Sequence, residues 1–394
     1  MDSFFAVTAP GLEPFTALEL SRLFPDIAPV TDIQALSPIQ PSSFRLHPLD
    51  GGVLFKGDLT ALYRANLHLR TASRILARLG NFFYATTFPA LQQRLARLPW
   101  ERFLTPRQPV SIRVTCHKSK LYHSDAVARS VSAALEERLG QASPILKAGE
   151  DSDQPPQLVV VRLAEDKCTV SVDSSGRLLH KRGYRQAVAK APLRETLAAA
   201  LLMASGWDLA SPLLDPFCGS GTIPIEAALM ALGIPPGINR RFAFMDWPGF
   251  DSQQWESVRS EAIPLHPSSF TLPPLLASDR DAGAIKMAQA NAERAGISDY
   301  IEFKCQAVSS ITPPPALGWV VTNPPYGLRL SEGKDLRNLY AQFGNVLREK
   351  CPGWDLSVLC SDPALLGQMQ VKLDTSLALV NGGIRVRLGR GIVR

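Results

Sequence analysis

The string TNPPYG, at residues 322–327, holds the side chains best suited to chemistry, and it follows a predicted strand. Its two consecutive prolines fix φ and remove two backbone donors, so the loop presents acceptors. Asn323 Oδ1 and the carbonyl of Pro324 can accept both hydrogens of a planar amine, while Tyr326 offers a ring to stack on the base that bears it. A plain proline-rich turn is the structural alternative. We expect an amine-activating loop whose catalytic residues are Asn323, Pro324, Pro325 and Tyr326.

A second site is predicted at DPFCGSGT, residues 215–222, between a predicted strand and a predicted helix. Gly219 and Gly221 let the backbone turn sharply beside a ligand, and the helix N-terminus offers free N–H groups. No lysine follows the glycines, so this is not a Walker phosphate loop. Asp279 ends the next predicted strand and can accept both hydroxyls of an adenosine ribose. The two motifs together indicate a ligand that contains adenosine.

The positive charge of the chain is concentrated near its beginning. Residues 61–140 hold thirteen Lys or Arg and four acids, a balance of +9, whereas the whole chain carries +6. Such a segment is typical of a protein that grips a polyanion, and a solvated face is the alternative. A helix predicted from Asp58 to Gly80 carries an arginine stripe, and a short loop follows a strand predicted at 110–114. The expected phosphate contacts are Arg70, Arg74, Arg78, Lys118 and Lys120.

A second basic cluster lies in the segment that leads into the C-terminal half. Lys181, Arg182, Tyr184 and Arg185 place an aromatic ring among cations, a pattern that suits backbone neutralisation and base stacking. A folded strand with exposed charges is the alternative. A helix is then predicted from Pro192 to Gly206.

The order of predicted elements indicates an α/β protein. The N-terminal part mixes helices with strands, among them a hairpin formed by residues 157–163 and 167–173. After residue 211 the strand, turn and helix alternate, which predicts a doubly wound, mostly parallel sheet with ligands at the carboxyl ends of its strands. We assign no role to the long connection at 237–270. The expected strands of this sheet are 213–214, 275–278, 300–304, 319–322, 355–360 and 383–388.

Composition excludes several classes of protein. No apolar run is long enough to span a bilayer, and the N-terminus lacks the features of a secretory signal, so we expect a cytoplasmic protein. The six cysteines are scattered, without the spacing of zinc ligands, so we expect neither a structural metal nor a disulfide framework.

Several longer strings resemble one family, the bacterial THUMP-domain guanine-N2 RNA methyltransferases, particularly those acting on large-subunit 23S ribosomal RNA. The resemblance implies a ferredoxin-like domain at 1–66, a THUMP domain at 67–172, and a linker with a class I (Rossmann-like) methyltransferase domain at 173–394 whose mostly parallel sheet has seven strands. The strings are HKRGYR (180–185), APLRETLAAALL (191–202), DPFCGSGTIPIEAA (215–228), PPGINRRFAFMDW (235–247) and TNPPYGLRL (322–330).

The same resemblance implies S-adenosyl-L-methionine as the cofactor. Asn323, Pro324 and Tyr326 would hold the target guanine, with Asn323 also beside the cofactor. Such enzymes often carry an acid after the third strand, and Gln306 stands there instead, where its amide oxygen can accept the same bond. Ribosomal RNA is the expected partner; transfer RNA, duplex DNA methylated at adenine N6, and a non-catalytic RNA-binding role are the alternatives. The implied cofactor contacts are Asp215, Phe217, Gly219, Ser220, Gly221, Thr222, Asp279 and Gln306.

Overall fold

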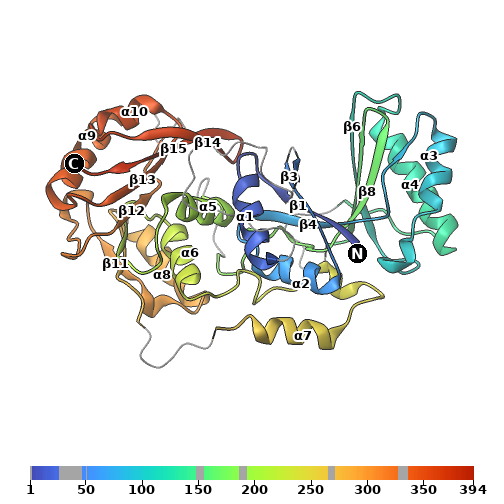
Figure 1. The fold of residues 1–394 in the computed structure, drawn as a ribbon, viewed down its shortest axis with the longest axis horizontal. Coiled ribbons are helices and arrows are strands. Elements are labelled where there is room, and N and C mark those ends of the chain that lie inside the picture. Colours follow the sequence, from blue (N-terminus) through green and yellow to red (C-terminus); the bar gives the residue numbers. More distant parts are fainter. Residues whose placement is uncertain are drawn as a thin grey trace.

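The chain forms two sheets that lie toward opposite ends of an elongated molecule (Figure 1). The computed structural model describes residues 2–25, 47–49, 51–147, 155–185, 193–264, 271–326 and 336–394. Within these ranges no helix is both long and apolar enough to cross a bilayer.

The N-terminal sheet has eight strands in the order β2-β3-β1-β4-β8-β7-β6, with β5 paired to β8. Antiparallel pairing of β4 with β8, where Leu76 lies opposite Asp173, joins two α+β parts into one continuous sheet. The first part comprises β1 (Asp2–Thr8), α1 (Glu13–Leu23), β2 (His47–Leu49), β3 (Gly52–Gly57), α2 (Leu59–His68) and β4 (Ala72–Arg78). The second comprises β5 (Phe83–Tyr84), α3 (Phe88–Ala96), a 3₁₀ turn (Trp100–Arg102), β6 (Val110–His117), α4 (Ser124–Leu139), β7 (Gln157–Ala164) and β8 (Lys167–Asp173).

The helix predicted from Asp58 to Gly80 is wrong beyond its first three turns. Asp58 caps α2 by accepting from the Ala61 amide, but the helix ends at His68, and residues 72–78 form β4. Strand β4 pairs with β1 on one side and with β8 on the other, and its apolar side chains are buried, so pairing in the sheet overrides the helical spacing. The arginine stripe therefore does not exist as one helical face.

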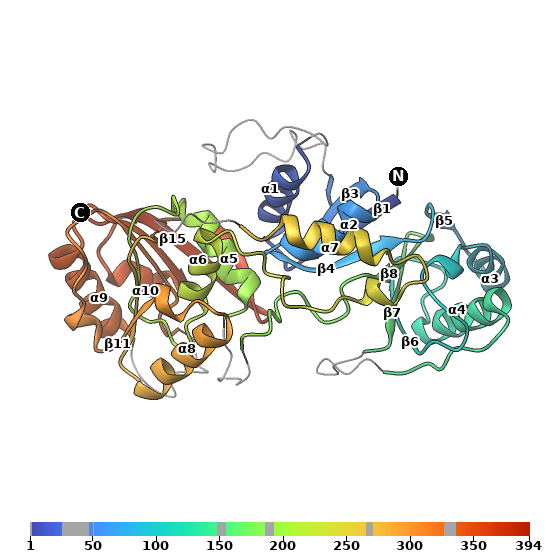
Figure 2. The same ribbon diagram turned by 90° about the horizontal axis from the view of Figure 1, so that it is seen from below.

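The connection at 237–270, which received no role from the sequence, completes the N-terminal core. Its helix α7 (Ser252–Glu261) lies against α2, away from the C-terminal sheet (Figure 2). The ring of Phe244 lies tilted against that of Tyr63, with centroids 4.6 Å apart, and Trp255 meets Tyr63 edge-on at 5.8 Å. Residues 265–270 lie outside the described part. The connection thus packs on the N-terminal core, although it links α6 and β10 of the C-terminal half.

The C-terminal sheet has seven strands in the order β11-β10-β9-β12-β13-β15-β14. Strands β9 to β13 run parallel to one another, and β15 runs antiparallel to β13 and β14, so the predicted mostly parallel sheet is confirmed. Its strands are β9 (Leu213–Asp215), β10 (Leu275–Asp279), β11 (Glu302–Cys305), β12 (Trp319–Thr322), β13 (Asp355–Cys360), β14 (Asp374–Asn381) and β15 (Ile384–Ile392).

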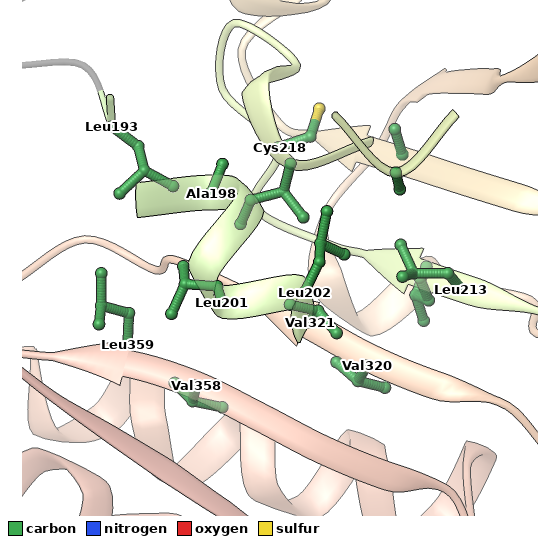
Figure 3. Close-up of a cluster of buried hydrophobic side chains, with 14 of the residues drawn as sticks. Leu193, Ala198, Leu201, Leu202, Leu213, Cys218, Val320, Val321, Val358 and Leu359 are labelled. Atoms are coloured by element: carbon green, nitrogen blue, oxygen red, sulfur yellow. The ribbon is translucent and has the colours of Figure 1, made fainter. Parts of the chain in front are cut away.

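Helices cover both faces of this sheet. Leu201 and Leu202 of α5 lie over Val320, Val321, Val358 and Leu359 of β12 and β13 (Figure 3). The predicted helix from Pro192 to Gly206 is confirmed from Glu195 onward, with Gly206 in the left-handed C-cap; Pro192 lies outside the described residues. The helices are α5 (Glu195–Ser205), α6 (Thr222–Ala231), α8 (Ala282–Arg294), α9 (Arg337–Lys350) and α10 (Pro363–Gln368).

Candidate active site

The glycine-rich turn connects the carboxyl end of β9 to the N-terminus of α6. Gly219 and Gly221 have φ of +51° and +80°, conformations that side chains of other residues adopt at a cost. A Cβ on Gly221 would lie 3.0 Å from the Cβ of Ala288, so this glycine also lets α8 approach. The Ser220 carbonyl accepts from Asn291 Nδ2 at 3.0 Å. The turn is therefore fixed by its neighbours rather than by its own side chains.

Two acids face this turn from adjacent parallel strands. Asp279 Oδ2 accepts from the Gly219 amide at 3.1 Å, and its Oδ1 accepts from the Asp281 amide at 3.0 Å. Asp215 is buried; its Oδ1 accepts from Thr322 Oγ1 at 2.6 Å, while its Oδ2 is buried without a partner. Burial raises the pKa of Asp215 to about 7, the Thr322 and Phe217 hydrogen bonds oppose the rise, and the nearby Asp279 charge adds to it.

The TNPPYG loop follows β12 directly, so it starts beside Asp215. Asn323 is half-buried, and its Oδ1 is a buried acceptor without a hydrogen-bond partner. The Tyr326 ring is 9% exposed, and its hydroxyl accepts from Asn381 Nδ2 at 3.0 Å. Tyr340 Oη donates to the Pro325 carbonyl at 3.2 Å. The stacking role of Tyr326 stays a prediction, and residues 327–330 of the matching string lie outside the described part.

The remaining cofactor predictions fall at the same edge of the sheet. Phe217 is half-buried and meets Phe343 edge-on at 5.1 Å. The backbone amide of Gln306 donates to the Asp279 carbonyl at 3.0 Å, which places Gln306 one strand beyond the acid. Thr222 is buried, and its Oγ1 accepts from Arg185 at 2.5 Å, so this hydroxyl already has a protein partner.

Three residues of the second basic cluster, Arg182, Tyr184 and Arg185, bind other residues of the protein and do not form an RNA-facing surface. Tyr184 is 4% exposed, and its hydroxyl donates to Glu226 Oε1 at 3.1 Å, so it cannot stack on a base here. Arg182 is buried and donates to the same oxygen at 3.4 Å and to the Arg70 carbonyl at 2.6 Å. Arg185 pairs with Glu195 at 3.4 Å. These three residues join the linker to α5 and α6, which contradicts their predicted role as RNA contacts.

The three N-terminal arginines are also engaged within the protein. Arg70 donates to the carbonyls of Leu229 and Ile234 and lies 4.0 Å from Glu226, which accounts for its burial at the junction of the two halves. Arg74 pairs with the buried Asp173 and donates to the Gly176 carbonyl. Arg78 lies half-buried with its guanidinium 5.1 Å from the Phe5 ring. Because all three guanidinium groups are engaged within the protein, the structure does not support their predicted phosphate contacts.

Two of the three lysines that were predicted to contact RNA are more accessible than these arginines. Lys118 and Lys120 are exposed in the loop between β6 and α4. Lys181 is half-buried and lines a cleft together with Arg240 and Arg241. The volume of this cleft is about 1220 Å³ when the open solvent at its mouth is included. The RNA contacts of these lysines stay predictions.

Family models match three consecutive stretches of the chain. Residues 182–388 match the methyltransferase domain described as UPF0020, RMKL-like. This stretch covers more than half of the 394 residues and contains both the glycine-rich turn and the TNPPYG loop. The chain belongs to the RMKL-like methyltransferase family. In this RMKL-like protein, residues 42–76 further match the RlmL ferredoxin-like domain and residues 85–173 the THUMP domain.

Relatives of this RMKL-like methyltransferase span its whole length. The "Putative RNA methyltransferase slr0064" of Synechocystis sp. is 32% identical over 97% of this chain and 94% of its own. The crystal structure of SMU.472, "complexed with SAH", superimposes with a TM-score of 0.82 at 29% identity over 100% of this chain and 98% of its own. A "predicted N6-adenine-specific DNA methylase" from Listeria monocytogenes gives 0.80 at 32% identity over 98% and 95%.

Sequence reasoning missed three residues that hold the site in place. Glu226 binds the linker cations from α6, Tyr340 supports the Pro325 carbonyl from α9, and Asn381 holds Tyr326 from the end of β14. The acid in the string IPIEAA gave a usable signal, because a charged residue within an apolar helix must find a partner. Tyr340 and Asn381 carried no local signal, since their partners lie 15 and 55 residues away.

Proposed function

We propose that this RMKL-like methyltransferase transfers the methyl group of S-adenosylmethionine to the exocyclic N2 amine of a guanine in 23S ribosomal RNA. S-adenosylmethionine supplies an electrophilic methyl group on a sulfonium. The residues at the turn fit that cofactor. Asp215 Oδ2 is a buried acceptor in need of a donor, and Asp279, held by two backbone amides, keeps lone pairs for ribose hydroxyls.

The observation that carries the proposal is the pair of buried, partnerless oxygens at the ends of β9 and β12. Asp215 Oδ2 and Asn323 Oδ1 come from adjacent parallel strands, and the Thr322 hydroxyl links those strand ends by its bond to Asp215. A buried acceptor left unpaired costs roughly 1–3 kcal/mol, so both atoms favour donors from bound molecules. One acceptor belongs to the cofactor turn and the other to the amine-activating loop, as transfer between two neighbouring ligands requires.

The chain's own residues act chiefly by placement. Asn323 Oδ1 and the Pro324 carbonyl accept from the target amine and direct its lone pair toward the methyl donor. Tyr340 holds the Pro325 carbonyl and Asn381 holds the Tyr326 hydroxyl, so the conformation of the loop is fixed before the substrate binds. The burial of Asn323 Oδ1 and of the Tyr326 side chain helps to exclude water from the reacting nitrogen.

RNA is favoured over DNA by the N-terminal half. The THUMP match at 85–173 and the RNA methyltransferase name of the Synechocystis relative support an RNA substrate. The RlmL ferredoxin-like match and the shared strings favour guanine N2 in large-subunit RNA. The name of the Listeria neighbour keeps adenine N6 of DNA as the competing target.

Nucleoside mass spectrometry tests the proposal directly. Purified protein and labelled S-adenosylmethionine are incubated with 23S RNA, transfer RNA and duplex DNA, all from a strain that lacks the gene, and each nucleic acid is digested to nucleosides. We expect labelled N2-methylguanosine from 23S RNA. The same nucleoside from transfer RNA alone would change the substrate, and labelled N6-methyladenine from DNA would overturn the proposal.

A further inference from the structure

Three aromatic rings are exposed at one tip of the second part of the N-terminal sheet, the part that comprises β5 to β8. Phe82, Tyr84 and Tyr122 are 51%, 65% and 67% exposed, more than any other aromatic side chain in the described ranges. Single exposed apolar residues are common on protein surfaces, but a group of rings at one place is not. The Phe82 and Tyr84 rings meet edge-on, with centroids 6.0 Å apart.

The turn between β7 and β8 brings these rings together. The Ala85 amide, next to Tyr84, donates to the Asp166 carbonyl at 3.0 Å. On the other side, the Lys120 amide donates to Asp166 Oδ1 at 2.7 Å, and the Ser119 hydroxyl accepts from the Asp166 amide at 3.0 Å. Tyr122 extends from that same loop. The tip is therefore one bonded unit built from three segments of the chain.

Cations are interleaved with the rings of this tip. Lys167 Nζ lies 3.7 Å from the centroid of the Phe82 ring, which orients that ring and leaves its other face available. Lys118 and Lys120 are exposed in the loop that carries Tyr122. Two acids, Glu165 and Asp166, form the turn itself, and the Asp166 carboxylate already accepts from the Lys120 amide.

We propose that this tip, formed by Phe82, Tyr84 and Tyr122 with Lys118, Lys120 and Lys167, binds unpaired bases of the RNA substrate by stacking. Rings beside cations fit a single strand, because every base presents a face to stack on and the phosphates meet the lysines. A paired duplex keeps its base faces covered. The tip lies in the half of the molecule away from the methyltransferase sheet (Figure 2), so it contacts RNA remote from the methylated base. The proposal rests on RNA being the substrate.

Binding of a short fluorescein-labelled single-stranded RNA of mixed sequence, followed by anisotropy over a series of salt concentrations, tests the tip. Tyr84→Ala and Tyr122→Ala should each weaken binding about 5- to 150-fold, the range that corresponds to loss of one stacked base. Their salt slopes should match the unmodified protein, because no phosphate contact is lost. Tyr84→Phe keeps the ring and should bind normally. Lys118→Gln with Lys120→Gln should instead flatten the slope, by about 0.7 per lost contact.

Tyr300→Ala is the matched control, since Tyr300 is 41% exposed but belongs to the methyltransferase domain. Unchanged affinity in both tyrosine-to-alanine variants, or equal loss in Tyr300→Ala, would overturn the stacking tip. Competition by the same RNA annealed into a duplex should be weaker than competition by the single strand; equal competition also counts against the tip. The nucleoside assay is separate, so methylation of 23S RNA alongside normal binding by the tip variants would refute the tip and leave the proposed function standing.

Discussion

Ligand binding at the glycine-rich turn should depend on pH through Asp215. Burial raises the pKa of this carboxyl to about 7, so a large part of the ligand-free protein carries a neutral Asp215 near neutrality. We expect its Oδ2 to accept from the cationic end of S-adenosylhomocysteine, which requires the ionised form. Affinity should then be weaker by about 11-fold at pH 6, about 2-fold at pH 7 and about 1.1-fold at pH 8, relative to the alkaline plateau.

Isothermal titration calorimetry with S-adenosylhomocysteine measures this directly. Repeating the titration near neutrality in buffers of different ionisation enthalpy should show release of about half a proton on binding. Asp215→Asn should bind more weakly, with little dependence on pH over the same range. An affinity that is constant from about pH 6 to pH 8 would refute the reasoning, because the ligand would then not need the Asp215 charge.

The same raised pKa sets the sign of a stability effect. Between about pH 4 and pH 7 the folded protein holds a proton on Asp215 that the unfolded chain has lost, so the free energy of unfolding falls as pH rises. About three pH units at 1.36 kcal/mol each give an upper bound of about 4 kcal/mol. The unmodified protein should lose more stability than Asp215→Asn over this interval, as measured by denaturant titration in the absence of ligand.

Three further substitutions test other parts of the site. Asn323→Ala should lower turnover by about 100-fold or more while S-adenosylhomocysteine affinity stays nearly unchanged, measured by labelled methyl transfer and calorimetry; equal losses in both would make the loop structural. Glu226→Ala leaves Arg182 buried without its carboxylate and should cost about 3–5 kcal/mol in denaturant titration, with an unchanged midpoint contradicting the buried network. Tyr340→Phe removes the bond to the Pro325 carbonyl, worth about 1 kcal/mol, and should slow turnover about fivefold; normal turnover would show that the loop does not need this support.

The sequence predicted that the two motifs lie at one edge of the sheet because the signals for their placement are local. The two glycines, the acids that end β9 and β10, and the prolines after β12 each lie within a few residues of the strand that positions them. Parallel strands then bring their carboxyl ends to one edge, so strand order was sufficient to bring the two motifs together. Strand β14 was not predicted, although its end supplies Asn381.

The errors came from contacts between distant residues. Leucines and arginines spaced three and four apart around Leu69 to Leu79 fit a helix, and only pairing of β4 with β1 and β8 decides for a strand. Arg182 and Tyr184 looked like an RNA surface because their counter-charge, Glu226, lies more than forty residues further along. The ion-pair partner of a cation that lies this far along the chain can be identified only from the structure.

The segment that carries Phe242, Phe244 and Trp255 has a consequence for synthesis on the ribosome. These rings belong to the same core as Phe4 and Tyr63, although nearly two hundred residues separate Tyr63 from Trp255. At about 5–20 residues per second, roughly ten to forty seconds pass between the emergence of the two. During that interval the first domain has an open apolar face, and the chain has already made the glycine-rich turn. The nascent protein therefore completes its first domain only after its second has begun.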